Sequence, residues 1–325
     1  MAARDLIKKV VKTAFDRGGG LNVARWANRK GLRILMYHRF REPEPLARQL
    51  HHIRQHYSPV SMMQVSDWFS HAGRLPDNAL AVTVDDGYRD FHQVAYPVFR
   101  EYEIPVTVYL VSGFLDGRLW LWVDQVRHAF LHSPAQSFRL ELSGHPPRSF
   151  ELGTIESRKT AAHAVTEAVK KLPNATRLQL LERLPRELRV NLPEEAPADY
   201  ESMRWEEARE LAAVGIEFGA HTCTHPILSR VASEQELADE IAGSKRRIEE
   251  QLERPVDHFC YPNGSSHDFS PEAVAAVQAA GYRTAVTTES GLNYAAADRF
   301  RLLRIGVEPG LEDGYFQRCA AGFRV

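Results

Sequence analysis

Residues 79–87 read Ala-Leu-Ala-Val-Thr-Val-Asp-Asp-Gly, so an apolar run leads directly into a pair of carboxylates. Six consecutive apolar and β-branched residues predict a buried strand, which places Asp85 and Asp86 at its carboxyl end. Two adjacent carboxylates repel each other unless a cation or a proton lies between them. We therefore expect one of them to bind a metal ion and the other to act as a base. On these residues alone, an ordinary acidic turn is the alternative.

Short apolar runs alternate with helical patterns on both sides of this stretch. Strands are expected at residues 33–38, 106–111, 216–220, 256–261 and 283–287, and helices at residues 45–56, 91–102, 205–214, 234–252 and 271–280. This alternation favours an α/β fold with a parallel sheet, and a barrel is the natural closure of such a sheet. The pattern is interrupted at about 116–200. We expect a largely helical insertion there, grown from one loop of a domain that spans 33–325.

The composition is that of a globular protein. The chain has 325 residues, of which 44% are hydrophobic and 26% charged, so disorder is excluded as the main state. It has no run of about 20 apolar residues, the length that a membrane-spanning helix needs, and no visible secretory signal. Three cysteines without a CxxC pair fit a reducing compartment. A cytoplasmic protein is therefore expected.

A strong charge asymmetry lies under the near-zero net charge. Residues 1–41 carry eleven basic and two acidic residues, or 11 − 2 = +9, which leaves −10 for the rest of the chain. Apolar residues recur at helical spacing within 6–15, so residues 1–32 are interpreted as a basic amphipathic helix region. Such a helix can lie on an anionic membrane, here the inner face, or it can pack on the fold with its basic face solvated. The pattern does not favour nucleic acid as a partner.

Two histidines follow the strand expected at 216–220. The segment reads His221-Thr222-Cys223-Thr224-His225, and histidines at i and i+4 share one face of a helical turn, as two ligands of one zinc ion would. Cys223 would point away and is left out of the site. Two imidazoles and one carboxylate match the three protein ligands of an open catalytic zinc site.

Two further segments are candidates for the same site. Residues 259–264 read Phe-Cys-Tyr-Pro-Asn-Gly, and the tight turn that they predict could present a backbone N–H to a cleft or be a bare turn. Arg304, in a later apolar segment, could point inward beside a carboxylate or be a solvated arginine.

At these motifs the chain resembles the polysaccharide deacetylase family, also called the NodB-homology family or carbohydrate esterase family 4. The family motif TFDDG is matched by Thr83–Gly87, with Val84 in place of the aromatic residue. The motif H-[ST]-x-x-H is matched in full by His221–His225, and the third motif loosely around Pro262. The resemblance covers about residues 33–115 and 203–307.

The resemblance implies a fold, an activity and a set of roles. The implied fold is a distorted (β/α)7-type barrel, and the implied enzyme is a metal-dependent hydrolase of carbon–nitrogen bonds other than peptide bonds, which removes N-acetyl or O-acetyl groups from a glycan. It implies one divalent metal ion, usually zinc, and an acetylated glycan as substrate. By position, Asp85 would be the catalytic base, the metal ligands would be Asp86, His221 and His225, and the substrate and oxyanion positions would be Tyr261 and Asn263.

The chain also departs from the family pattern. Phe259 stands where the family has an arginine that holds the base, and we expect Arg304 to supply that guanidinium from another strand end. The histidine that supplies the family's general acid is missing, which leaves His38 and His267 as candidate replacements. Aromatic side chains suit the flat faces of sugars, so stacking on sugar rings and packing in the core are both interpretations of Trp120 and Trp122.

Two other functions are compatible with the sequence. One is a hydrolase on the same scaffold that acts on a non-sugar amide or a cyclic imide. The other is a carbohydrate-binding protein that has lost turnover. The absence of the acid histidine allows this function, but the base retained at Asp85 weighs against it, because a protein that only binds carbohydrate needs no base.

Overall fold

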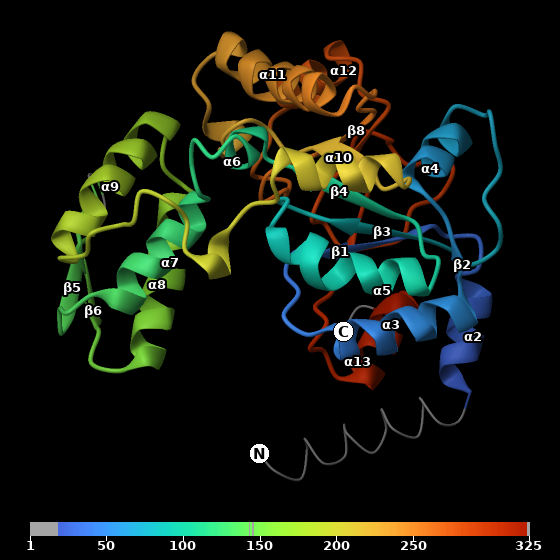
Figure 1. Ribbon diagram of the computed structural model, residues 1–325, viewed down its shortest axis with the longest axis horizontal. Helices are drawn as coiled ribbons and strands as arrows, with labels where there is room; N and C mark the ends of the chain where they lie inside the picture. The colour runs from blue at the N-terminus through green and yellow to red at the C-terminus, as the bar shows by residue number, and fades with distance from the viewer. Residues whose placement is uncertain (1–18, 143, 145, 324–325) are drawn as a thin grey trace.

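The core of the molecule is a parallel β-sheet surrounded by helices. Figure 1 shows a computed structural model, which describes residues 19–142, 144 and 146–323. The strands of the sheet follow in the order β10-β1-β3-β4-β7-β8-β9, with the short β2 beside β3. They are β1 (Arg33–Tyr37), β2 (Ser58–Pro59), β3 (Ala79–Val84), β4 (Val106–Leu110), β7 (Glu217–Ala220), β8 (His258–Cys260), β9 (Thr284–Val286) and β10 (Ile305–Gly306).

One segment near the C-terminus connects the two edges of this sheet. At one edge, Leu302 forms a parallel bridge with Val286 of β9. Three residues later, Ile305 of β10 pairs with Leu35 of β1 at the other edge. The curled sheet is thereby closed into the distorted (β/α) barrel that the sequence predicts. Every residue of β3 is buried, as expected for a strand covered on both faces.

Helices cover the outside of the barrel, and most of them lie within a residue or two of the ranges expected. The connecting helices are α3 (Pro43–His56), α4 (Met62–Phe69), α5 (Tyr96–Glu101), α6 (Ser112–Leu115), α10 (Trp205–Ala213), α11 (Glu234–Leu252) and α12 (Pro271–Ala279), with α13 (Asp313–Ala320) after β10. Short turns of helix lie at Phe91–Ala95, Ala198–Tyr200 and Leu228–Arg230. The apolar faces of most of these helices pack with the sheet in one large hydrophobic core, while Met62 and Val65 of α4 belong to a second cluster.

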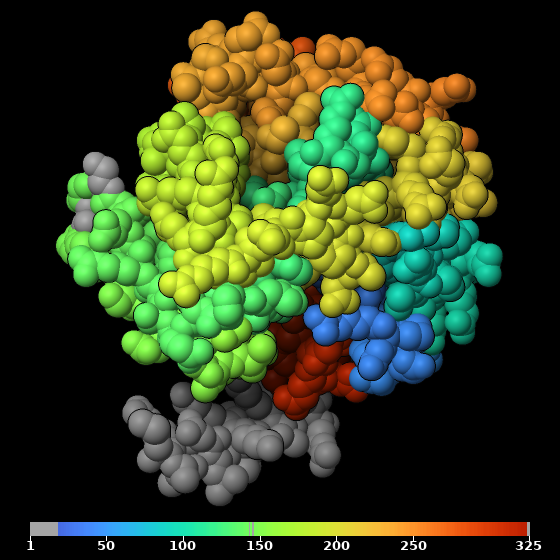
Figure 2. Space-filling model, turned by 60° about the vertical axis from the view of Figure 1, so that its left-hand side comes forward, coloured from blue at the N-terminus to red at the C-terminus, as the bar shows by residue number. Residues whose placement is uncertain are grey.

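Between β4 and β7 the chain forms a separate lobe, at the left of Figure 1. Its elements are α7 (Trp122–His132), β5 (Ser137–Leu140), β6 (Arg148–Glu151), α8 (Ile155–Val169) and α9 (Asn174–Glu187). This lobe has its own hydrophobic cluster, and Figure 2 shows it in green and yellow-green against the barrel. The antiparallel pair β5–β6 was not predicted, because both strands are short and mostly polar and exposed.

The described part of the chain begins with a short helix that packs near the C-terminal end. The amphipathic pattern predicted within 6–15 lies outside the described residues. The first described helix, α2 (Gly20–Ala27), buries Leu21 and Ala24 against Ala321. None of the helices that the structure describes is both long and apolar enough to cross a bilayer. All three cysteines are free thiols.

Candidate metal centre and catalytic site

The candidate residues meet at one end of the barrel. Asp85 and Asp86 directly follow β3, His221 directly follows β7, and Cys260 is the last residue of β8. Because β3, β4, β7 and β8 are parallel neighbours, their carboxyl ends lie at the same end of the barrel. Barrel enzymes place their active sites at this end.

Three side chains converge as a set of metal donors. Nε2 of His221 lies 3.5 Å from Oδ1 of Asp86, and Nε2 of His225 lies 3.6 Å from the same oxygen. One donor atom from each residue lies within 4.8 Å of the others. Donors bound at about 2.0–2.1 Å to one tetrahedral ion are separated by roughly 3.3 Å, so the arrangement fits one divalent metal ion with little movement. All three side chains are buried.

The imidazole of His221 is oriented so that Nε2 faces the other donors. Its Nδ1 lies 2.7 Å from the backbone oxygen of Cys260. A hydrogen bond of this kind commonly fixes the tautomer of a metal-binding histidine. Burial lowers the pKa of His221, but Cys260 and Asp86 outweigh burial and hold the pKa well above its ordinary value, so a metal ion bound at Nε2 would displace a proton. Burial, followed by the neighbouring His221, lowers the pKa of His225 to about 3, so this imidazole is neutral, as a metal ligand must be.

The loop that carries both histidines is not a helical turn, contrary to the geometry expected from their spacing. Thr222 and His225 have φ angles of 69° and 55°, in the left-handed region, and the loop is irregular. The hydroxyl of Thr222 accepts a hydrogen bond from the backbone N–H of His225 at 3.0 Å. The two imidazoles converge because the loop folds back on itself, and not because they share one face of a helix. Asp86 is also left-handed, with φ 76°.

Asp85 lies beside the metal donors and is held by Arg304. The guanidinium donates 2.7 Å hydrogen bonds to both oxygens of the Asp85 carboxylate, and it also donates to Thr83 Oγ1 at 3.1 Å. Asp85 is 2% exposed and Arg304 fully buried. Burial alone would raise the pKa of Asp85, but the charge and hydrogen bonds of Arg304 outweigh it and hold the pKa below its ordinary value. The carboxylate is therefore ionised.

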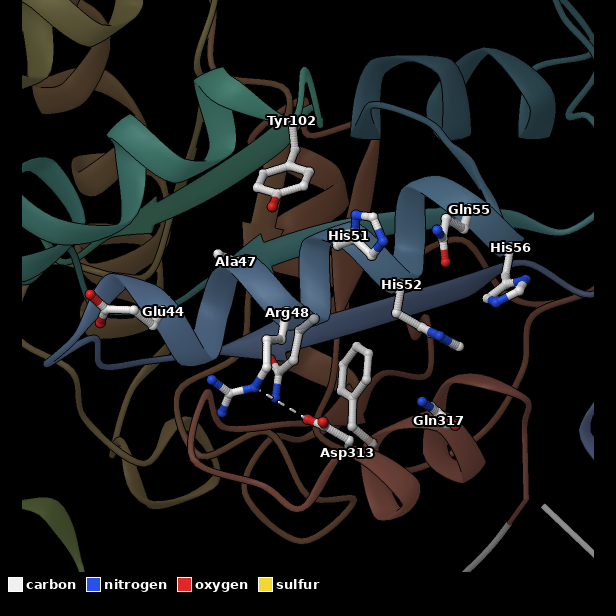
Figure 3. A pocket seen from close by; sticks show the side chains of 12 residues that line it. Glu44, Ala47, Arg48, His51, His52, Gln55, His56, Tyr102, Asp313 and Gln317 are labelled. Carbon is white, nitrogen blue, oxygen red and sulfur yellow. Dashed lines mark ion pairs between the residues drawn. The ribbon is translucent and has the colours of Figure 1, made fainter. Parts of the chain in front are cut away.

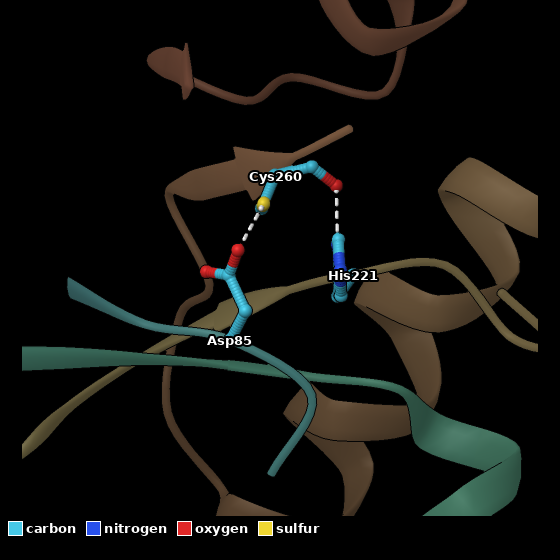
Figure 4. Close-up of side chains that lie close together, drawn as sticks. All are labelled: Asp85, His221 and Cys260. Carbon is cyan, nitrogen blue, oxygen red and sulfur yellow. Dashed lines mark hydrogen bonds between the residues drawn. The ribbon is translucent and has the colours of Figure 1, made fainter. Parts of the chain in front are cut away.

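Cys260 was not among the predicted site residues, yet it contacts both halves of the site. Its Sγ lies 3.5 Å from Oδ2 of Asp85, and its backbone oxygen lies 2.7 Å from Nδ1 of His221. Figure 4 marks both contacts with dashed lines. The Sγ of Cys260 also lies 3.2 Å from Nη2 of Arg304. The only sequence signal is its place at the end of an apolar run before a Pro-Asn-Gly turn, which marks the backbone position but not the contact.

The turn after β8 separates the two residues predicted to face the substrate. Tyr261 is fully buried, stacks on Phe269 and donates its hydroxyl to the carbonyl of Phe300. Its ring and hydroxyl are therefore held in the interior and do not face a substrate. Asn263 is half-buried with φ 57°, and its backbone N–H has no acceptor within the described part of the chain.

The two candidate acid histidines differ in position. Nε2 of His38 lies 3.7 Å from Oδ2 of Asp85, and its side chain is 46% exposed. His38 lines a pocket of about 540 Å³ between the segment after β1, the segment after β10 and Arg127 of α7. In Figure 2 the blue, red and green parts of the surface meet in this region. His267 is exposed, and its ring contacts none of the described site residues.

Trp120 and Trp122 do not offer their faces to solvent. Their exposed fractions are 6% and 5%, so of the two interpretations, packing in the interior is the one that the structure supports. Trp120 packs with Tyr88 and Phe114, whereas Trp122 belongs to the hydrophobic cluster of the insertion.

A second pocket lies away from these residues, between α3 and α13. Figure 3 shows it, with His51, His52 and His56 on α3 and an ion pair between Arg48 and Asp313. None of the metal donors or their neighbours lines it. Among the described residues, the histidines of this pocket do not form a group that could hold a metal ion.

Comparisons with known proteins agree with the fold and the motifs. Residues 72–146 and 159–285, more than half of the chain, match the family model described as polysaccharide deacetylase. YxkH of Bacillus subtilis, a protein assigned by its name to the polysaccharide deacetylases, is 20% identical over 293 residues, which cover 88% of this chain and 74% of that protein.

Solved structures of deacetylases share the fold. The Streptococcus pyogenes deacetylase PplD in complex with acetate superposes with a TM-score of 0.55 at 20% identity, over 86% of this chain and 93% of that one. IcaB from Ammonifex degensii gives a TM-score of 0.57 at 17% identity, over 90% of this chain and 96% of that one. At these identities the likeness shows the fold.

Proposed function

The chain belongs to the polysaccharide deacetylase family, whose enzymes deacetylate glycans, and we propose that this member hydrolyses N-acetyl groups on a sugar chain or glycan precursor. One observation carries the proposal. Donor atoms of Asp86, His221 and His225 converge on one point, while a separate carboxylate, Asp85, lies beside them and is kept ionised by Arg304. A protein that only binds carbohydrate needs no such base.

The metal site would be formed by Asp86, His221 and His225, and zinc is the metal that we propose. A divalent ion held there would polarise the acetyl carbonyl and lower the pKa of a bound water. The donor set of two imidazoles and one carboxylate is typical of catalytic zinc sites that keep one position open.

The remaining chemistry belongs to the residues around that site. Asp85 accepts the proton of the attacking water, a role that typically contributes 10²–10⁴-fold to the rate. The backbone N–H of Asn263 donates to the acyl oxygen as negative charge develops there, and loss of one such donor costs about 3–4 kcal/mol of transition-state stabilisation. His38 donates the proton that the leaving amine requires, since its Nε2 faces Asp85 and its side chain reaches the solvent-filled pocket.

The central experiment separates the metal ligands from the base. We expect the purified protein to bind about one equivalent of zinc and to release acetate from N-acetylated chito-oligosaccharides. His221→Ala and His225→Ala should lose both properties, while His267→Ala, the matched control at an exposed histidine, should keep both. Asp85→Asn should keep the metal and lose acetate release. Full metal content in His221→Ala and His225→Ala would overturn the assignment.

The same assay tests the alternative of a hydrolase that acts on non-sugar substrates. If the protein binds zinc and cleaves simple amides or cyclic imides but releases no acetate from acetylated sugars, the non-sugar hydrolase is the correct function.

We further propose a cytoplasmic location with peripheral contact at the inner membrane face, supported by the basic pattern of residues 1–32. Recovery of the full chain in the soluble fraction at low salt would contradict the membrane contact.

A further inference from the structure

The insertion contacts the metal-binding loop through one side chain. Nε1 of Trp122, the first residue of α7, donates a 3.0 Å hydrogen bond to the backbone oxygen of His225. Two residues after His225, Ile227 is buried in the hydrophobic cluster of the insertion. The loop that supplies two of the three metal donors is therefore seated on the insertion as well as on the barrel.

The same helical turn contacts the other metal-binding loop. Asp124, two residues after Trp122, accepts a 2.5 Å hydrogen bond from the hydroxyl of Tyr88, which lies two residues after Asp86. Tyr88 and Asp124 are both buried. The backbone oxygen of Gly87, between Asp86 and Tyr88, accepts a further hydrogen bond from the N–H of Met203, where the chain returns from the insertion to the barrel.

The ring of Trp122 is in turn contacted by a residue of the insertion. The guanidinium of Arg177, on α9, lies 5.2 Å from the centroid of the indole ring. Arg177 is 2% exposed, and both its Nε and Nη2 donate to Asn174 Oδ1. No carboxylate among the described residues forms an ion pair with Arg177. The contact of its buried guanidinium with the ring of Trp122 is therefore one of its main interactions. The orientation of the indole N–H is thus fixed by the interior of the insertion.

These contacts lie next to residues whose backbone conformation is unfavourable. Asp86 and His225 both have positive φ angles, and a non-glycine residue in that region typically costs about 1–3 kcal/mol unless its surroundings impose the conformation. Metal donors must also be placed within a few tenths of an ångström. Partners of metal ligands typically change metal affinity by 10–100-fold when they are removed.

We propose that the first turn of α7 is a clamp on the metal centre, in which Trp122 positions the His225 loop and Asp124 positions the Asp86 loop through Tyr88. Both are positioning residues. The seating of the insertion and the occupancy of the metal site are therefore coupled, so each stabilises the other. This inference rests on the proposed metal site, and it assigns to the insertion a role in metal affinity.

Cobalt binding, followed by its visible absorption and by zinc competition, tests the clamp. Trp122→Phe keeps an aromatic ring beside Arg177 but removes the indole N–H, and we expect it to weaken metal binding about 10-fold. Tyr88→Phe removes the other hydrogen bond and should have a comparable effect. Trp68→Phe is the matched control, because Trp68 lies on α4 and packs on Phe69, and the structure gives its indole N–H no partner among the described residues. Its metal affinity should equal that of the wild type.

Hydrogen exchange gives an independent readout that does not depend on turnover. Zinc should slow amide exchange in α7 of the wild-type protein, and this protection should be reduced in Trp122→Phe and unchanged in Trp68→Phe. Wild-type affinity in both Trp122→Phe and Tyr88→Phe would overturn the clamp while leaving the metal site intact. Failure of the wild-type protein to bind any divalent metal would instead overturn the proposed function.

Discussion

The guanidinium of Arg304 and the carboxylate of Asp85 form a two-point pair, with one 2.7 Å hydrogen bond to each carboxylate oxygen. Asp85 directly follows β3, whereas Arg304 directly precedes β10, so two segments far apart in the sequence meet in a buried pair. Arginine suits this place because its planar fork matches both oxygens at once, whereas lysine is a point charge.

Arg304→Lys should therefore be a damaging substitution even though the charge is retained. We expect kcat to fall by at least about 10-fold, because the carboxylate loses one of its two anchors. The pKa of Asp85 should rise, since Arg304 holds it below its ordinary value, so the acidic limb of the pH–rate profile should move to higher pH. Arg247→Lys is a matched control, as Arg247 makes a similar pair with Asp116 outside the site. An unchanged acidic limb in Arg304→Lys would contradict the role of the pair.

The pair also predicts a pH-dependent contribution to folding. The pKa of Asp85 is lower in the folded than in the unfolded state, so its ionisation stabilises the fold above the unfolded pKa of about 4. That stabilisation is lost as pH falls through the folded-state pKa. Asp85→Asn leaves Arg304 buried without its partner and should cost about 3–5 kcal/mol near neutral pH. In urea unfolding from pH 7 to pH 3, the difference from wild type should shrink below pH 4, and a constant difference would argue against the predicted linkage.

His38 is expected to matter only when the leaving group needs a proton. We predict that His38→Gln reduces kcat for an N-acetyl sugar by about 10²-fold or more, while metal content stays at the wild-type level. Hydrolysis of an activated aryl acetate should hardly change, because a phenolate of low basicity leaves without protonation. His267→Gln is the control and should behave as wild type on both substrates. Equal losses on amide and ester would show that His38 supports the site in some other way.

Much of the architecture could be predicted from local pattern. The buried strands β3 and β4 are continuous apolar runs, and motifs at their carboxyl ends must meet at one end of a parallel barrel whatever the details of the loops. For the same reason, Asp85, Asp86 and the two histidines could be predicted as neighbours from the order of the strands alone.

The remaining features depend on contacts that no local pattern encodes. Cys260 contacts Asp85 although β8 lies three places from β3 in the sheet, because the curled sheet brings the ends of these strands together. The residue type of Cys260 carries no sign of that contact. The sequence could not decide whether the rings of Tyr261 and Trp122 face the core or the cleft, because an aromatic residue next to a motif has the same sequence signature in both cases. The left-handed loop at His225 was mistaken for a helical turn, since spacing fixes a face only when the backbone is regular.

The contact between α6 and the loop that carries His221 and His225 gives a last prediction. The N–H of Gly113 donates a 2.9 Å hydrogen bond to the backbone oxygen of Cys223, midway between His221 and His225. A Cβ atom at residue 113 would lie 2.6 Å from that same oxygen, which is closer than real Cβ contacts allow. Because the obstructing atom is backbone, the loop must shift as a whole. We expect Gly113→Ala to weaken zinc binding about 10-fold and to lower kcat, with little change in the fold.

Gly153→Ala is the matched control for this substitution. A Cβ atom at residue 153 would meet only the end of the Gln136 side chain, at 3.8 Å, so this variant should bind zinc as the wild type does. Titration of both variants with zinc, alongside circular dichroism to compare their folds, makes the comparison direct. Since Gly113 touches neither a metal donor nor the pocket beside His38, weaker binding in its variant alone would mean that the position of the loop backbone limits metal affinity. Wild-type affinity in Gly113→Ala would mean that the loop can move by several tenths of an ångström without cost, and the left-handed conformations at Thr222 and His225 would then not be essential to the site.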